Sequence, residues 1–274
     1  MNNKILVSTG AYLGKVNNFD HSLIKKLSSR IYCDGYELMI YKMLYDDERS
    51  YSKTIVESGV NFHTVHLDKL LGDYLSRNKD GDKEFVLSCF EKNILLAKKI
   101  GVNKGVLHLW GGLPSDQNIS VNIDFFDNLY NLAKSHSFLL MVENIPCNKS
   151  YNPFQHWETL YKEYGDKVRF TLDTRFIEFH GLWDYFYNAD WLWQNNLIEH
   201  VHISDYKGNV NQWECLHKAL PIGQGQIDFI RFLKHIVSKG YKNAITIECS
   251  ARVDNRIDTD LLNHCIHYVR ESIK

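Results

Sequence analysis

Short hydrophobic runs alternate along the chain with longer stretches whose hydrophobic positions recur every three or four residues. Two of the longer stretches, 84–101 and 227–240, have the periodicity of amphipathic helices and end at a glycine, a common helix stop. The short runs are rich in aliphatic and β-branched residues and predict eight strands: KILVST (4–9), YELMI (36–40), NFHTVH (61–66), GVLHL (105–109), FLLMVE (138–143), VRFTLD (168–173), HVHIS (200–204) and AITIE (244–248). Eight strand–helix units in 274 residues predict an α/β fold, a single closed (β/α)8 barrel. An open, doubly wound sheet is the alternative, although eight units would be many for it.

Nothing in the sequence divides the chain, so we expect one domain over residues 1–274. Hydrophobic residues make up 44% and charged residues 24%, which permits a packed core and argues against disorder. No window approaches the roughly 20 apolar residues of a membrane span. The apolar run near the N-terminus is too short for a signal-peptide core. We therefore expect a cytoplasmic protein that does not enter a membrane.

The charge balance bears on nucleic-acid binding, and the cysteine spacing bears on the state of the thiols. Lys and Arg total 32 against 33 for Asp and Glu, without a basic block. Proteins that depend on phosphate-backbone attraction usually carry a basic patch, so the even balance argues weakly against nucleic acid. The six cysteines are irregularly spaced and form no C-x-x-C pair, which predicts buried, reduced thiols.

Three carboxylates stand at the carboxyl ends of predicted strands, where the active site of a (β/α)8 barrel forms. Glu143, Asp173 and Glu248 each follow a large aliphatic residue that would face the helices. Because side chains alternate along a strand, the three carboxylates would then point inward.

Four histidines share this inward alternation. In HVHISD (200–205), His202 lies at the height of the carboxylates, and His200 lies one pleat deeper, where we expect a hydrogen bond to hold it. His66 and His108 lie at or near the ends of two earlier predicted strands. A single strand-end carboxylate is more often a helix cap or ion-pair partner, and a lone inward histidine is more often a core residue. Several strand-end carboxylates and inward histidines together favour a site for Zn²⁺, Mn²⁺, Co²⁺ or Mg²⁺, because buried carboxylates without a cation repel one another.

The ordered motifs resemble the xylose isomerase-like TIM-barrel superfamily, which includes sugar-phosphate isomerases and epimerases and the AP endonuclease family 2. The motifs are VENIP (142–146), TLDT (171–174), HVHISD (200–205), LPIGQGQIDF (220–229), TIE (246–248) and LLAKKIGVNKGVLHLWGG (95–112). The resemblance implies one divalent metal ion held by Glu143, Asp173, His202 and Glu248. It also implies that Glu143 and Glu248 transfer a proton beside a substrate carbonyl through a metal-stabilised enediolate.

Two related activities stay open under this resemblance, and a non-catalytic ligand-binding barrel is a third possibility. An inosose-type dehydratase would use the same site. An endonuclease IV-like phosphodiesterase would place a second metal at His66 and His108. Its third metal site is not supported, because Phe176 and Ala219 stand where that group carries histidines.

The sequence signals for substrate contacts are less specific than those for the metal site. Arg175 suits a carboxylate or phosphate but equally an ion pair, and Lys207 suits a polar substrate group but equally a solvated loop. Trp110 suits a sugar-pocket wall or core packing, and GQG (223–225) suits a phosphate loop or a plain turn. We include His66, His108, Trp110, Arg175 and Lys207 as substrate contacts. The partner expected is a small carbohydrate-like molecule, and we expect a homo-oligomer because family members often form dimers or tetramers.

Overall fold

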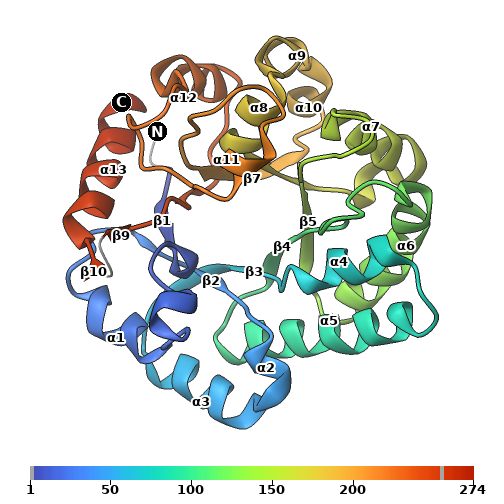
Figure 1. Cartoon of the computed structure of the whole chain (residues 1–274), viewed down its shortest axis with the longest axis horizontal. Helices are drawn as coiled ribbons and strands as arrows, with labels where there is room; N and C mark the ends of the chain where they lie inside the picture. Colours follow the sequence, from blue (N-terminus) through green and yellow to red (C-terminus); the bar gives the residue numbers. More distant parts are fainter. Residues whose placement is uncertain (1–2, 254–255) are drawn as a thin grey trace. The chain divides into compact units, whose positions relative to one another are not determined.

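The computed structural model describes residues 3–253 and 256–274. Its eight parallel strands follow one another in chain order and close into a barrel, so the predicted (β/α)8 fold is confirmed (Figure 1). The strands are β1 (Ile5–Ser8), β2 (Gly35–Met39), β3 (Phe62–His66), β4 (Lys104–Leu107), β5 (Leu139–Glu143), β6 (Phe170–Asp173), β7 (Ile198–Ile203) and β8 (Ile245–Ile247). Every predicted strand overlaps one of these. A short hairpin follows, formed by β9 (Arg252–Val253) and β10 (Arg256–Ile257).

Helices connect the strands. They are α1 (Ser22–Ser28), α2 (Met43–Asp46), α3 (Glu48–Glu57), α4 (Leu70–Arg77), α5 (Asp82–Lys99), α6 (Ile119–Ser135), α7 (Pro153–Tyr164), α8 (Thr174–His180), α9 (Trp183–Asn188), α10 (Asp190–Gln194), α11 (Trp213–Leu216), α12 (Phe229–Ser238) and α13 (Thr259–Ser272). Three 3₁₀ turns are η1 (Thr9–Ala11), η2 (Lys15–Asn17) and η3 (Gly165–Lys167). Both sequence-predicted helices are confirmed as α5 and α12, and Gly101 and Gly240 after them have left-handed φ angles of 74° and 80°. No helix among the described residues is both long and apolar enough to cross a membrane.

The chain forms two compact units, each with its own packing. One unit contains residues 3–37, 58–61 and the described part of 172–274. In it, β1 pairs with β8 on one side and with β2 on the other, and β7 pairs with β8. The register places Ser8 opposite Glu37 and His202 opposite Thr246. Parallel pairing therefore brings polar residues of neighbouring strands in this unit to the same level.

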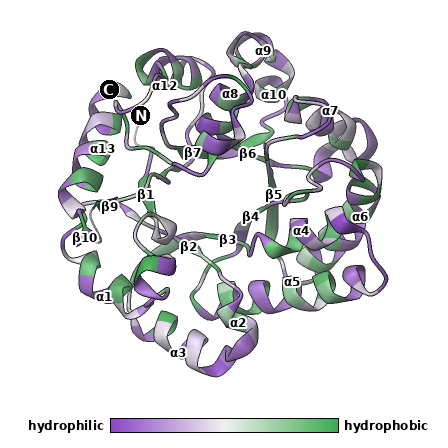
Figure 2. Cartoon of the chain, viewed as in Figure 1, coloured by the Kyte–Doolittle hydropathy of each residue, from purple (hydrophilic) through white to green (hydrophobic). Residues whose placement is uncertain are grey.

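The other unit contains residues 38–57 and 62–171. Its strands β3, β4 and β5 pair in sequence, and the short helix α4 and the long helices α5 and α6 pack against one another (Figure 1). Strand β5 is coloured hydrophobic while α5 alternates hydrophobic and hydrophilic turns (Figure 2). This matches strands covered on both faces and helices covered on one.

Two close contacts set the positions of loops in this second unit. Trp157 of α7 stacks on Phe170 of β6 with ring centroids 4.2 Å apart. Gly72 of α4 lies against the chain after β4, where an added Cβ would be 2.5 Å from the carbonyl oxygen of His108. The helix therefore packs directly against the backbone of a predicted site loop.

Candidate functional site

Three of the predicted metal ligands come together within the first unit. Asp173 ends β6, His202 is the fifth residue of β7, and Glu248 directly follows β8. All three are buried, and each offers a ligand atom within 4.8 Å of the others. Asp173 also caps α8, because its Oδ1 accepts a hydrogen bond of 2.7 Å from the backbone N–H of Arg175. The cap and the strand end together hold this carboxylate in place.

Carboxylates flank both ring nitrogens of His202. Nδ1 lies 3.2 Å from Glu248 Oε2, and Nε2 lies 3.1 Å from Glu37 Oε2. His200 is fully buried and contacts the same Glu37 oxygen at 3.2 Å, so the predicted hydrogen bond that holds it is present. Burial alone would raise the pKa of Glu37, but the charge and hydrogen bonds of His202 and His200 outweigh burial and lower it. The two imidazoles therefore favour the charged form of Glu37.

The second unit contains a separate cluster of His66, His108 and Glu143. Glu143 Oε2 lies 2.8 Å from His108 Nε2 and 3.5 Å from His66 Nε2. His66 Nδ1 lies 2.8 Å from the Leu67 carbonyl oxygen, so Nδ1 carries the hydrogen and, in the neutral ring, Nε2 presents a lone pair toward Glu143. Burial lowers the pKa of His108 to about 3, so this ring is neutral and its Nε2 faces the Glu143 carboxylate.

Both clusters have the donor chemistry of a divalent cation site. Neutral imidazole nitrogens and carboxylate oxygens are the ligands of Zn²⁺, Mn²⁺ and Co²⁺. In the first unit, Asp173 and Glu248 are buried carboxylates, and the cation beside Asp173 is Arg175, whose Nη2 lies 3.6 Å from Asp173 Oδ2. A bound cation would offset the cost of burying these charges. The residues present therefore fit the metal that the sequence predicts.

The predicted substrate contacts lie in different environments. Lys207 is exposed on the chain after β7. Arg175 is mostly buried, and its Nη1 donates to the Leu216 carbonyl at 2.7 Å, so part of its donor capacity is already used. Trp110 is fully buried, and its Nε1 donates to the Ile145 carbonyl at 3.0 Å. Its position favours the packing interpretation over a wall of a sugar pocket, because both ring and donor are occupied by protein.

The GQG loop is a turn built on Asp205, the last residue of HVHISD. Asp205 Oδ2 accepts the backbone N–H groups of Gly223 and Gly225 at 3.0 and 2.8 Å. Oδ1 accepts those of Tyr206 and Ile227 at 2.8 and 3.1 Å. An internal carboxylate thus satisfies these amides. This arrangement favours the plain turn over the phosphate-binding loop.

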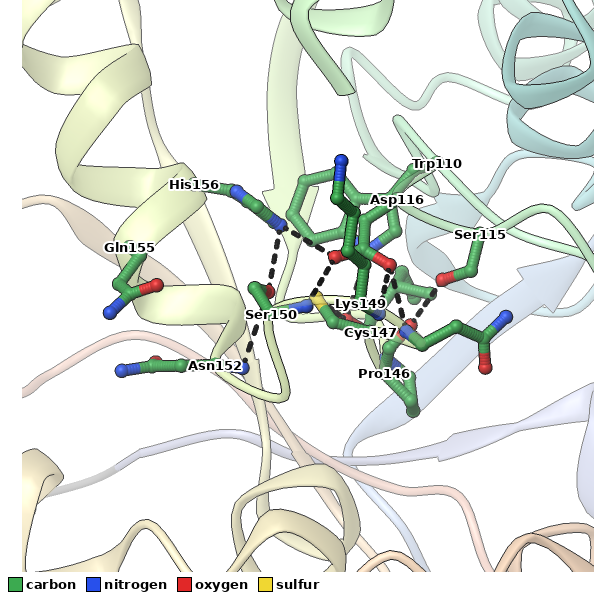
Figure 3. A network of polar contacts seen from close by, with 12 residues as sticks. Trp110, Ser115, Asp116, Pro146, Cys147, Lys149, Ser150, Asn152, Gln155 and His156 are labelled. Carbon is green, nitrogen blue, oxygen red and sulfur yellow. Dashed lines mark hydrogen bonds and ion pairs between the residues drawn. The ribbon is translucent and has the colours of Figure 1, made fainter. Parts of the chain in front are cut away.

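Sequence reasoning missed another buried aspartate, Asp116, in the loop between β4 and α6 (Figure 3). Asp116 Oδ1 accepts the N–H groups of Asn148 and Lys149 at 2.8 Å each, and Oδ2 accepts that of Ser150 at 2.9 Å. His156 Nε2 lies 3.4 Å from Oδ2. The loop after β5, which begins directly after Glu143, is thereby tied to the loop after β4. No local sequence signal marks a side chain whose partners lie in a different loop.

Cys147 lies beside this aspartate, but the group has a structural character. The thiol is buried, and burial raises its pKa well above the ordinary value. A neutral thiol is a poor metal ligand, and Asp116 already accepts three backbone donors. The contacts of Asp116 therefore organise the loop.

Comparison with known proteins supports the fold over most of the chain. Residues 28–264 match the family model described as xylose isomerase-like TIM barrel. No curated protein matches the sequence significantly.

Solved structures with the same fold include several sugar epimerases. A D-tagatose 3-epimerase-like protein aligns with a TM-score of 0.70 at 17% identity, covering 99% of this chain and 100% of that one. A D-allulose 3-epimerase from Methylomonas sp., solved with D-allulose, aligns with a TM-score of 0.72 at 13% identity, covering 98% and 97%. A 3-keto-D-glucoside 4-epimerase from E. coli aligns with a TM-score of 0.64 at 17% identity, covering 98% and 100%. At these identities the likeness concerns the fold. Because the family model spans most of the sequence, the chain belongs to the xylose isomerase-like TIM-barrel family.

Proposed function

We propose that this protein is a divalent-metal-dependent isomerase or epimerase of a sugar, sugar phosphate or related hydroxy-carbonyl compound. The observation that carries the proposal is the buried set of Asp173, His202 and Glu248 at the carboxyl ends of β6, β7 and β8 in a member of this family. Glu143 ends β5 and would complete the ligand set, since the carboxyl ends of barrel strands converge on one mouth. The structural neighbours named as epimerases of ketoses and keto-sugars agree with this substrate class.

In the proposed reaction, the ion and the two glutamates have different roles. A bound divalent ion would supply Lewis-acid stabilisation of negative charge on substrate oxygens. Glu143 and Glu248 would take a proton from the carbon beside the carbonyl and return one. Glu143 Oε2 lies 2.8 Å from His108 Nε2, and Glu248 Oε2 lies 3.2 Å from His202 Nδ1, so each glutamate stands beside an imidazole. Arg175 and Lys207 are proposed to contact polar substrate groups, and His66 and His108 to line the same site.

A phosphodiesterase of the endonuclease IV kind is the second candidate, favoured by one observation. His66, His108 and Glu143 form a compact cluster that could hold another metal. A dehydratase using the same ligands is a variant of the first proposal. We keep the isomerase as the first proposal for two reasons. The chain has no excess of positive charge that would attract nucleic acid, and Phe176 stands where endonuclease IV-like enzymes carry a histidine ligand of their third metal.

Metal content and proton exchange test the proposal together. We expect about one Mn²⁺, Co²⁺, Zn²⁺ or Mg²⁺ per chain in protein purified without chelator. We also expect one member of a panel of ketoses, sugar phosphates and inososes to exchange a carbon-bound hydrogen with deuterated water. Two or three zinc ions per chain with cleavage of abasic DNA would favour the phosphodiesterase. Failure to bind metal after it is added back would refute the proposal.

Two glutamate variants and a matched control test whether Glu143 and Glu248 transfer the proton. Glu143→Gln and Glu248→Gln should each reduce exchange by about 10²–10⁴-fold, the usual contribution of a general acid or base. Glu199→Gln is the control, because Glu199 lies near the start of β7 and contacts Asn243 Nδ2 at 3.2 Å. Full exchange in either strand-end variant would contradict the assignment.

A further inference from the structure

Glu37 is a buried charge that the proposed chemistry does not use. It lies in β2, opposite Ser8, and is fully buried. A buried carboxylate is costly unless hydrogen bonds or a charge compensate it. Its Oε2 contacts two imidazoles, those of His202 and His200. The pairing of one buried carboxylate with two histidines needs an explanation.

We propose that Glu37 is a positioning residue that holds the ring of His202 so that Nδ1 is the nitrogen available to the metal. The inference rests on the proposed function and deepens it. A carboxylate can only accept a hydrogen bond, so the nitrogen 3.1 Å from Glu37 Oε2, which is Nε2, carries a hydrogen. Nδ1 faces the opposite way, toward Glu248 Oε2 at 3.2 Å, on the side of the other predicted ligands. Glu37 thus determines which nitrogen of His202 can coordinate an ion.

His200 explains why two histidines alternate in this strand. Its Nε2 lies 3.2 Å from Glu37 Oε2 and 2.9 Å from the Thr246 hydroxyl. The deeper ring therefore helps to hold Glu37, and Glu37 in turn holds the ring nearer the strand end. Ligating histidines commonly donate their other N–H to a carboxylate, and loss of such a partner typically weakens metal binding about 10–100-fold.

Glu37, His200 and His202 could instead hold a metal themselves, since their ligand atoms also lie within 4.8 Å of one another. That arrangement would require His202 Nε2 to lose its hydrogen. All three side chains are fully buried, and His200 Nε2 already contacts Thr246. The geometry therefore favours an orienting carboxylate over a ligand.

The experiment compares Glu37→Gln with a matched control, Thr246→Val. Zn²⁺ affinity is measured by competition with a chromophoric chelator, and ¹⁵N-histidine NMR of the Zn²⁺-loaded protein reports which nitrogen of His202 carries the hydrogen. We expect Nδ1 coordination and a protonated Nε2 in the wild type. Glu37→Gln should weaken Zn²⁺ binding by about 10–100-fold and change the Nε2–H signal. Thr246→Val removes a buried hydroxyl contact of His200 but leaves both partners of the Glu37–His202 contact in place, so Zn²⁺ affinity should stay within about twofold of the wild-type value.

Each alternative outcome is distinct. Equal Zn²⁺ affinity and an unchanged Nε2–H signal in Glu37→Gln would overturn the positioning role while leaving the proposed function intact. Two ions in the wild type, of which Glu37→Gln loses one, would make Glu37 a ligand and would also overturn it. Failure of the wild type to bind any divalent ion would instead refute the proposed function, and this inference with it. If Glu37→Gln does not fold, Glu37→Asp is used instead. Aspartate keeps the carboxylate on a shorter side chain, so this variant should also weaken Zn²⁺ binding.

Discussion

Asp116 provides the sharpest test of how the structure is held together near Glu143. In Asp116→Asn, one carboxylate oxygen becomes an amide N–H₂ group. If the amide oxygen keeps the N–H groups of Asn148 and Lys149, the new donor faces the N–H of Ser150. One buried backbone donor then loses its partner, at a cost of about 1–3 kcal/mol, and two charge-assisted hydrogen bonds become neutral ones. We expect the free energy of unfolding to fall by about 2–4 kcal/mol as these two effects combine.

The assay is equilibrium urea unfolding followed by tryptophan fluorescence, with thermal melting as a second measure. A loss of that size corresponds to a fall in Tm of about 5–15 °C for a chain this long. Asp127→Asn is the matched control, because Asp127 pairs with Lys167 at 2.7 Å while both side chains are more than a third exposed. An exposed pair contributes about 0–1 kcal/mol, so the control should change little.

The effect of Asp116 also depends on pH in a defined direction. Burial by itself would raise the pKa of this carboxyl, but His156 and the three backbone N–H groups outweigh burial and lower it below the ordinary value. A lowered folded-state pKa adds stability above the unfolded pKa of about 4, and that stability is lost as the pH falls further. The difference in free energy of unfolding between the wild type and Asp116→Asn should therefore be largest at pH 7 and become smaller below about pH 4. A gap at pH 7 no larger than the roughly 0.5 kcal/mol of an ordinary surface substitution, or one independent of pH, would refute this reasoning.

Three further predictions follow from single contacts. Gly72→Ala should lower Tm by several degrees and disturb the loop after β4, because its Cβ would lie 2.5 and 2.7 Å from the carbonyl oxygens of His108 and Trp110; an unchanged Tm would contradict that packing. Trp157→Leu should cost about 2–4 kcal/mol in urea unfolding through loss of its stack on Phe170, and a cost below about 1 kcal/mol would be evidence against it. Mn²⁺ or Zn²⁺ at about 100 times its Kd should raise the free energy of unfolding by about 2.7 kcal/mol, a gain that a chelator reverses and His202→Ala abolishes; equal stabilisation of His202→Ala would place the ion elsewhere.

Some sequence predictions stay as predictions. These are the metal-ligand roles of Glu143, Asp173, His202 and Glu248, the acid–base roles of Glu143 and Glu248, and the substrate contacts of His66, His108, Trp110, Arg175 and Lys207. The single domain over residues 1–274, the homo-oligomer and the cytoplasmic location also stay predictions. Only the Trp110 and GQG interpretations shift, toward packing and a plain turn.

The sequence by itself determined the strands and the side chains at their ends. Period-two alternation is a local property, so Val201 and Ile203 on one face predict His200 and His202 on the other. The same alternation predicted that the carboxylates ending FLLMVE and VRFTLD and AITIE would be buried, and they are. Eight such strands in order already implied a barrel whose chemistry lies at their carboxyl ends.

Only the tertiary structure decided which polar groups satisfy one another. Asp116 meets backbone donors that follow the next strand, β5, and Asp205 meets glycine amides that lie beyond α11, through loops without periodicity. Glu37 of β2 accepts from two histidines of β7, which is far along the chain. Hydrogen bonds require donor and acceptor within about 3 Å, and such distances depend on the packing of the whole chain. The residue types were visible in the sequence, but their partners became visible only when the strands and loops were placed in space.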